Sequence, residues 1–234
     1  MVSVNPVYQL PSWCPSPELQ IEWIRQFIKT TDCGLTDSDV SPDLLNQTLN
    51  FVPRTAGEVP LIGAYLPGKG DEDAVEHTFN KMWGAIKAPN DHDGKHRWNE
   101  LESSPKHIRL LPGTEHRHSP GIRLMALDVN ANQKMPVGSC WKNPAIVPDL
   151  ANIETMMLAA LAPEWVSSWN GSAESPYPNM PGYQFNLGPE GWTGSIGLGR
   201  WYYSGRRPLG LRTLWAGLTW DGWSSPTVRE VGKC

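Results

Sequence analysis

Residues 107–129 read HIRLLPGTEHRHSPGIRLMALDV and contain the two stretches that most clearly predict β-strands. The apolar runs His107–Leu111 and Ile122–Val129 flank the turn-rich segment PGTEHRHSPG. Two such runs joined by turn residues are typical of a β-hairpin. The stretch therefore predicts a hairpin with a long loop, and with it an antiparallel sheet.

The chain after residue 183 continues this pattern with short aromatic runs divided by glycines. Strands are expected at Tyr183–Leu187, Gly199–Tyr203 and Leu211–Trp220. The whole chain of 234 residues contains 22 Gly, 22 Pro and 12 Trp. So many turn formers predict short elements and an irregular, loop-rich domain.

Most of the expected helices open with a proline followed by an acidic residue. Proline at the first helical position loses no hydrogen bond, and the acid complements the helix dipole. In two cases a serine before the proline is also a good N-cap. Apolar residues then recur at helical spacing. The expected helices are Pro17–Thr31, residues 42–50, Asp71–Lys87 and Asp149–Leu161, the last continuing after a break through Pro163–Trp169.

These elements predict an α+β fold in which an antiparallel sheet carries several short helices packed on it. We expect a single domain over residues 1–234. Its helical N-terminal part covers about residues 1–90, and its aromatic-rich β part covers about 105–130 and 183–225.

Charge and hydropathy exclude several classes of function. The formal net charge is −4, which gives no global electrostatic reason to bind nucleic acid. The apolar stretches are far shorter than the roughly 20 residues that cross a bilayer, and prolines interrupt the first residues, so neither a membrane span nor a secretory signal is expected. A cytoplasmic location follows as the default expectation. The four cysteines lack metal or redox spacing and are expected to be structural thiols.

Two partial motifs are interpreted as accidental resemblances. Gly63–Gly70 has the spacing of a phosphate-binding P-loop, but Gly70 replaces the required hydroxyl and an acidic triplet follows it. Asp91–Glu100 has the spacing of the later positions of a calcium-binding EF-hand loop, but its first ligand position falls on Pro89. An ordinary turn and a solvated polar loop are expected instead.

A third motif is the histidine pair His116 and His118. An extended chain would direct both imidazoles to one side, which suits a divalent transition metal such as Zn²⁺. His107 and Asp128, in the two predicted strands, are candidate further ligands. A metal held there would support hydrolysis by an activated water. Solvent-exposed histidines in a polar loop are the simpler alternative.

The fourth candidate is an aromatic and arginine-rich C-terminal region, in which Arg and Trp are the residue types most enriched at protein-binding hot spots. The same tryptophans would also suit an irregular core. The candidate binding residues are Arg200, Trp201, Arg206, Arg207, Trp220 and Trp223.

The sequence therefore favours a non-enzymatic binding protein that contacts a protein partner through this C-terminal region and needs no cofactor. The alternative is a metal-dependent hydrolase or related enzyme centred on His116 and His118. Neither the partner nor the oligomeric state follows from the sequence.

Overall fold

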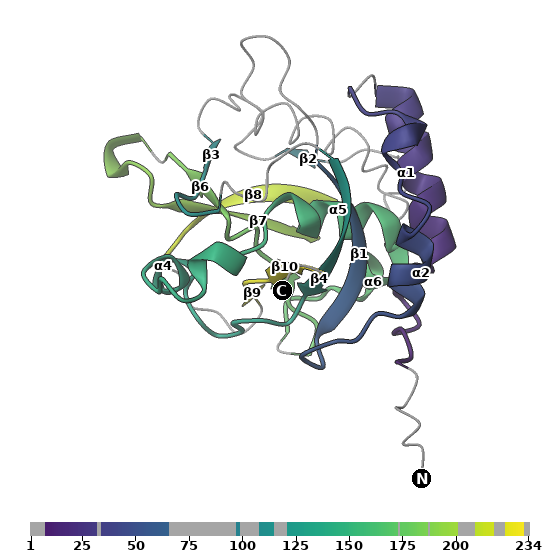
Figure 1. Cartoon of the computed structure of the whole chain (residues 1–234). Coiled ribbons are helices and arrows are strands. Elements are labelled where there is room, and N and C mark those ends of the chain that lie inside the picture. The colour runs from purple at the N-terminus through teal and green to yellow at the C-terminus, as the bar shows by residue number, and fades with distance from the viewer. Residues whose placement is uncertain are drawn as a thin grey trace.

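The computed structural model describes residues 8–31, 34–65, 97–98, 108–114, 121–172, 174–186, 188–200, 209–217 and 223–231. These residues form a mixed α+β fold, as the sequence predicts (Figure 1). The expected helix at Asp71–Lys87 lies outside the described residues.

The described elements are short and follow one another in mixed order. The helices are α1 (Pro17–Thr31), α2 (Leu44–Leu49), α4 (Val137–Trp141), α5 (Ile153–Leu161) and α6 (Pro163–Ser168), with 3₁₀ turns η1 (Asp37–Asp39), η5 (Val147–Asp149) and η6 (Gly188–Glu190). The strands are β1 (Glu58–Tyr65), β2 (Arg97–Trp98), β3 (Ile108–Leu110), β4 (Gly121–Asp128), β5 (Tyr177–Pro178), β6 (Tyr183–Phe185), β7 (Gly194–Arg200), β8 (Leu209–Trp215), β9 (Trp223–Ser224) and β10 (Thr227–Glu230).

The strands belong to two main sheets, and the two strands of the predicted hairpin lie in different ones. One sheet has the order β1-β4-β10, and the other has the order β2-β8-β7-β6-β3. Strand β4 pairs antiparallel with β1 and β10, whereas β3 pairs antiparallel with β6. The two apolar runs of residues 107–129 are therefore strands, but the prediction that they form a hairpin with each other is wrong. Their partners lie far away in the sequence, where local patterns give no information.

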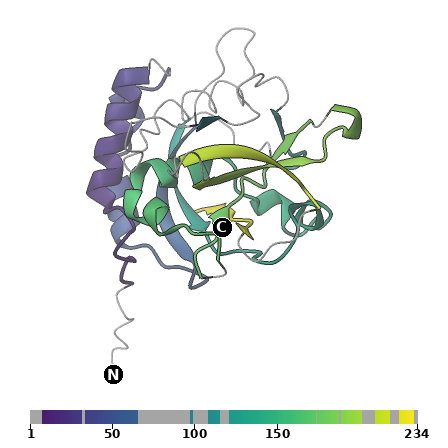
Figure 2. The same ribbon diagram turned by 180° about the vertical axis from the view of Figure 1, so that it is seen from behind.

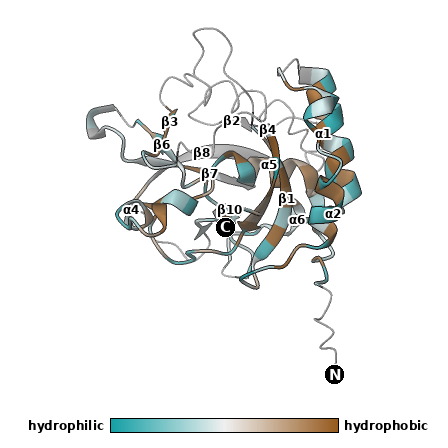
Figure 3. Ribbon diagram, in the orientation of Figure 1, coloured by the Kyte–Doolittle hydropathy of each residue, from teal (hydrophilic) through white to brown (hydrophobic). Residues whose placement is uncertain are grey.

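Helix α1 begins and ends where the sequence predicts. The Ser16 hydroxyl accepts a hydrogen bond from the Leu19 N–H at 3.3 Å, so it acts as the expected N-cap. Ile24, Phe27 and Ile28 form a buried stripe, and Figure 3 shows the hydrophilic residues of the same helix between its apolar ones. Burial of this stripe joins α1 to the main core.

Strand β1 is fully buried although it lies at the edge of its sheet. Its free edge is covered by the buried side chain of Gln20 on α1. The Gln20 amide donates to the Pro60 carbonyl at 3.1 Å, and its oxygen accepts from the Ile62 N–H at 2.8 Å. Gln20 thus supplies the hydrogen bonds that a neighbouring strand would supply, and the edge position tolerates Pro60.

Helix α5 is buried along almost its whole circumference rather than on one face. Eight of its nine residues are buried, including Met156, Met157 and Leu158. A helix that is apolar all round belongs inside a protein. The views from front and back place α1 at one side of the molecule and α4 at the other, with α5 between them (Figures 1 and 2).

Candidate functional site

Most of the predicted binding residues lie outside the described residues. These are Trp201, Arg206, Arg207 and Trp220. Arg200 is the last residue of β7, where it pairs with Leu209 of β8. Trp223 is 7% exposed in β9 and packs edge-on against Tyr177, with 5.5 Å between ring centroids. Trp223 therefore belongs to the core and does not contribute to an exposed surface.

The predicted metal ligands are placed only in part. His107, His116 and His118 lie outside the described residues. Asp128 is the last residue of β4. An extended strand of this length places it about 24 Å from Gly121, the first residue of β4. Its carboxylate accepts hydrogen bonds from the Thr55 hydroxyl at 2.6 Å and the Asn130 N–H at 3.0 Å. In the part of the chain that the structure describes, no group of three or more His, Cys, Asp or Glu residues is arranged to hold a metal.

The partial P-loop and EF-hand motifs also fall mainly outside the described residues. Gly63 lies within β1, and the structure describes the strand only as far as Tyr65. Both interpretations stay predictions.

The described cysteines are buried thiols with no disulfide. Burial raises the pKa of Cys14 to about 12. Burial also raises the pKa of Cys140, although a hydrogen bond involving Ser225 opposes the rise. Because the thiolate is the reactive form, neither side chain is suited to act as a nucleophile at neutral pH. This agrees with the structural role expected for them.

Two buried carboxylates, Glu58 on β1 and Glu154 on α5, have internal partners. Glu58 accepts two hydrogen bonds of 2.8 Å from Arg229 and another from the Arg54 N–H. Burial alone would raise the pKa of Glu58, but these hydrogen bonds and charges outweigh it, and the pKa is lowered. Glu154 on α5 accepts hydrogen bonds of 2.8 Å from the Tyr65 hydroxyl and the Asn152 N–H. Both carboxylates join elements of the core.

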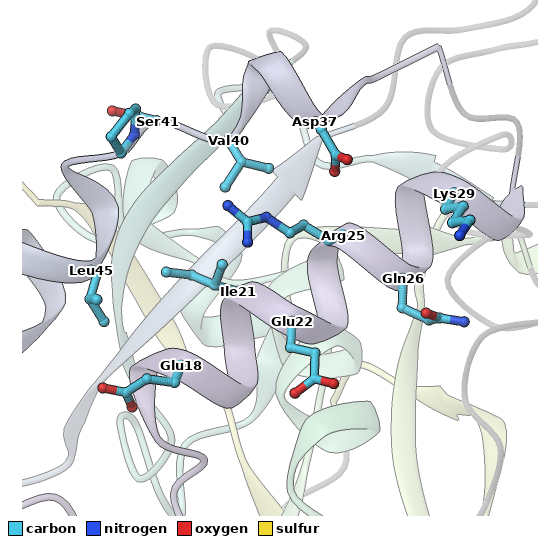
Figure 4. A pocket seen from close by; sticks show the side chains of 11 residues that line it. Glu18, Ile21, Glu22, Arg25, Gln26, Lys29, Asp37, Val40, Ser41 and Leu45 are labelled. Atoms are coloured by element: carbon cyan, nitrogen blue, oxygen red, sulfur yellow. The ribbon is translucent and has the colours of Figure 1, made fainter.

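A groove of about 540 Å³ lies between α1 and the segment from η1 to α2 (Figure 4). Its lining carries acids, including Glu18 and Asp37, as well as the bases Arg25 and Lys29. Charges of both signs over an apolar floor select no single class of ligand, so the groove by itself indicates no function.

A second pocket, of about 520 Å³, lies between α4 and the open end of the β7–β8 hairpin. We call it the aromatic pocket, and its lining comes from residues 136–142, 192–193 and 216–217. Trp141 and Trp192 are its two aromatic residues, and each residue is partly exposed. The exposed Lys142 lies on the same wall as Trp141.

Hydrogen bonds and a cation–π contact fix the walls of the aromatic pocket. The Trp141 Nε1–H donates to the Pro181 carbonyl at 2.7 Å. The Arg109 guanidinium lies 4.3 Å from the centre of the Trp192 ring, and its Nε donates to Gln184 at 2.8 Å. The Gly138 N–H donates to the Ala216 carbonyl at 2.8 Å, which joins α4 to the residue after β8.

Sequence analysis missed this pocket because its walls are distant in the sequence. Trp141, Trp192 and Ala216 are brought together only by the fold. One local signal was present, since the segment GPEGWTG surrounds Trp192 with glycines that allow a tight turn. Gly188 and Gly191 have φ values of 72° and 68°, a region that favours glycine.

Comparisons with known proteins identify no relative of this chain. No family model matches it, no curated protein matches it, and no solved structure matches its fold. In addition, none of the described helices has the length and apolarity needed to cross a membrane.

Proposed function

We propose that the protein is a non-enzymatic binding protein that contacts a protein partner through the connection between β7 and β8. The contact residues are Arg200, Trp201, Arg206 and Arg207, with Trp220 from the segment after β8. Trp223 is not one of the contact residues, because it is buried.

The observation that carries the proposal is the β7–β8 hairpin. Seven residue pairs run from Gly194–Trp215 to Arg200–Leu209, so residues 201–208 are the connection of a regular two-stranded ladder. Connections between paired strands generally run over the protein surface and carry binding residues on a rigid support. This connection contains one tryptophan and two adjacent arginines.

The chemistry of these residues fits a protein interface. Arginine and tryptophan bury large areas at modest entropic cost and retain hydrogen-bond donors. Two adjacent guanidinium groups without partners are too costly to bury together, which favours at least one of them at the surface. A negatively charged or aromatic patch on the partner would complement them.

The test is affinity capture of the partner from the native host by the full chain. Arg206→Ala/Arg207→Ala should lose a partner that the wild type captures, while its stability changes by less than about 0.5 kcal/mol. The matched control is Arg25→Ala/Lys29→Ala, which removes two positive charges from the exposed face of α1. Equal recovery of the same partner by both variants and the wild type would refute the proposal.

Two further readouts separate the alternatives. If the partner is a nucleic acid instead, capture should fall steeply with salt, because phosphate contacts release counterions. If the protein is a metal-dependent hydrolase, purified protein should contain stoichiometric metal that His116→Ala/His118→Ala removes.

We also propose a cytoplasmic location. The two free thiols at Cys14 and Cys140 support a reducing compartment.

A further inference from the structure

The aromatic pocket has the size of a small-molecule site. Its volume of about 520 Å³ is within the range of about 300 to 1,000 Å³ found for ligand pockets. It lies at the open end of the β7–β8 hairpin, about 20 Å along the strands from the Arg200–Leu209 pair. It is therefore separate from the protein-binding connection proposed above.

The pocket walls are formed before any ligand arrives. Trp141 is held by its hydrogen bond to Pro181, and Trp192 is held under the Arg109 guanidinium. The Ala216 N–H donates to the Thr193 carbonyl at 2.9 Å, which joins the residue after Trp192 to the residue after β8. A site with fixed walls loses little conformational entropy when a ligand binds.

The charge of the lining selects the sign of the ligand. Among the described residues that line the pocket, Lys142 is the charged one, and no carboxylate accompanies it. Arg109 adds a second positive charge against the Trp192 ring. The exposed hydroxyl of Ser139 offers a hydrogen-bond donor next to Lys142.

One polar atom of the lining lacks a partner. The Thr193 hydroxyl is buried and makes no hydrogen bond to any described residue. This oxygen has almost no solvent-accessible surface, so a ligand does not reach it while the walls keep this arrangement.

We infer that the aromatic pocket binds a small planar anion, that is, an aromatic or heterocyclic ring that carries a carboxylate, sulfonate or phosphate group. The ring stacks on the tryptophans, and the anionic group pairs with Lys142. Stacking on an aromatic side chain and pairing with a cation act on different parts of the same ligand, so each can be removed separately.

The experiment uses a matched pair of fluorescent probes with the full chain. 8-Anilinonaphthalene-1-sulfonate carries a flat naphthalene ring and a sulfonate, and N-phenyl-1-naphthylamine has the same rings without the sulfonate. The anionic probe should bind saturably at one site and more tightly than the neutral probe. Its affinity should also fall as salt is raised.

Two variants test the two halves of the site. Trp192→Ala should weaken binding of the anionic probe about tenfold or more, because it removes a stacking surface. Lys142→Glu should weaken the anionic probe but leave the neutral probe unchanged. Lys29→Glu on α1 is the matched control and should bind both probes like the wild type.

The possible results decide the inference in either direction. It is overturned if the anionic probe does not bind saturably, if the neutral probe binds equally tightly, or if folded Trp192→Ala keeps the wild-type affinity. Denaturation midpoints show whether Trp192→Ala is folded. If Trp192→Ala does not fold, the Lys142→Glu variant provides the test, because Lys142 is exposed. Unchanged affinity of the anionic probe for Lys142→Glu then overturns the inference.

Discussion

Two sides of the molecule differ in whether their polar and aromatic groups are buried with partners or partly exposed. We call the elements α1, β1, β4 and β10 the framework side. There Gln20 satisfies the free edge of β1, and Arg229 neutralises the buried Glu58. On the other side, the aromatic pocket leaves Trp141 and Trp192 partly exposed, and the Thr193 hydroxyl makes no hydrogen bond to a described residue. Closed, internally satisfied groups stabilise a fold, whereas open aromatic groups are available to bind.

The largest expected loss of stability comes from opening the Glu58–Arg229 ion pair on the framework side. Arg229→Met should lower the free energy of unfolding by about 3 to 5 kcal/mol, because it leaves a buried carboxylate without its cation. Urea denaturation measures the loss. The double variant Arg229→Met/Glu58→Gln should recover part of it, since the charge that lacked a partner is gone. A double variant as unstable as the single one would contradict this explanation.

The Gln20 side chain should have the next largest effect. Gln20→Ala leaves the Pro60 carbonyl and the Ile62 N–H buried without their partners, at a cost of about 2 to 3 kcal/mol. Gln26→Ala is the matched control on the exposed face of α1 and should stay within about 0.5 kcal/mol of the wild type. If both variants unfold at the same urea concentration, Gln20 does not protect the strand edge.

The lowered pKa of Glu58 predicts a smaller, pH-dependent effect. Because the folded pKa lies below the ordinary value of 4.5, the stabilisation is complete above that pH and is lost as the pH falls through the folded pKa. The stability difference between wild type and Glu58→Gln, followed by urea denaturation from pH 7 to pH 3, should therefore shrink below about pH 4.5. A constant difference would show that the carboxylate charge does not matter.

The smallest effect on stability is expected at the aromatic pocket. Arg109 is exposed, and its contact with Trp192 is a surface cation–π pair, so Arg109→Ala should cost under about 1 kcal/mol. Urea denaturation measures this cost. Arg25→Ala is the control, because it removes an exposed arginine from α1, away from the pocket. If Arg109→Ala lowers the free energy of unfolding by more than about 2 kcal/mol, the pocket contributes to stability like the framework side, which would contradict this comparison.

Local sequence signals account for the elements but not for how they combine. The serine cap and the helical spacing of the apolar residues predicted α1, because both are local properties of the sequence. Strand β1 was not predicted, and it contains Pro60 and Gly63, residue types that are depleted in strands. Its edge position and the Gln20 side chain, 40 residues away from Pro60, make Pro60 acceptable there. The aromatic pocket was not predicted, because Trp141 and Trp192 are far apart in the sequence and line one pocket only in the folded chain.

The most direct test of the account is hydrogen–deuterium exchange of the full chain with and without the partner that the wild type captures. The account predicts that the partner slows exchange in peptides covering residues 198–211, while peptides of α1 and β1 exchange as before. Protection confined to α1 and β1, with no change over residues 198–211, would contradict the proposal that the β7–β8 connection is the contact surface.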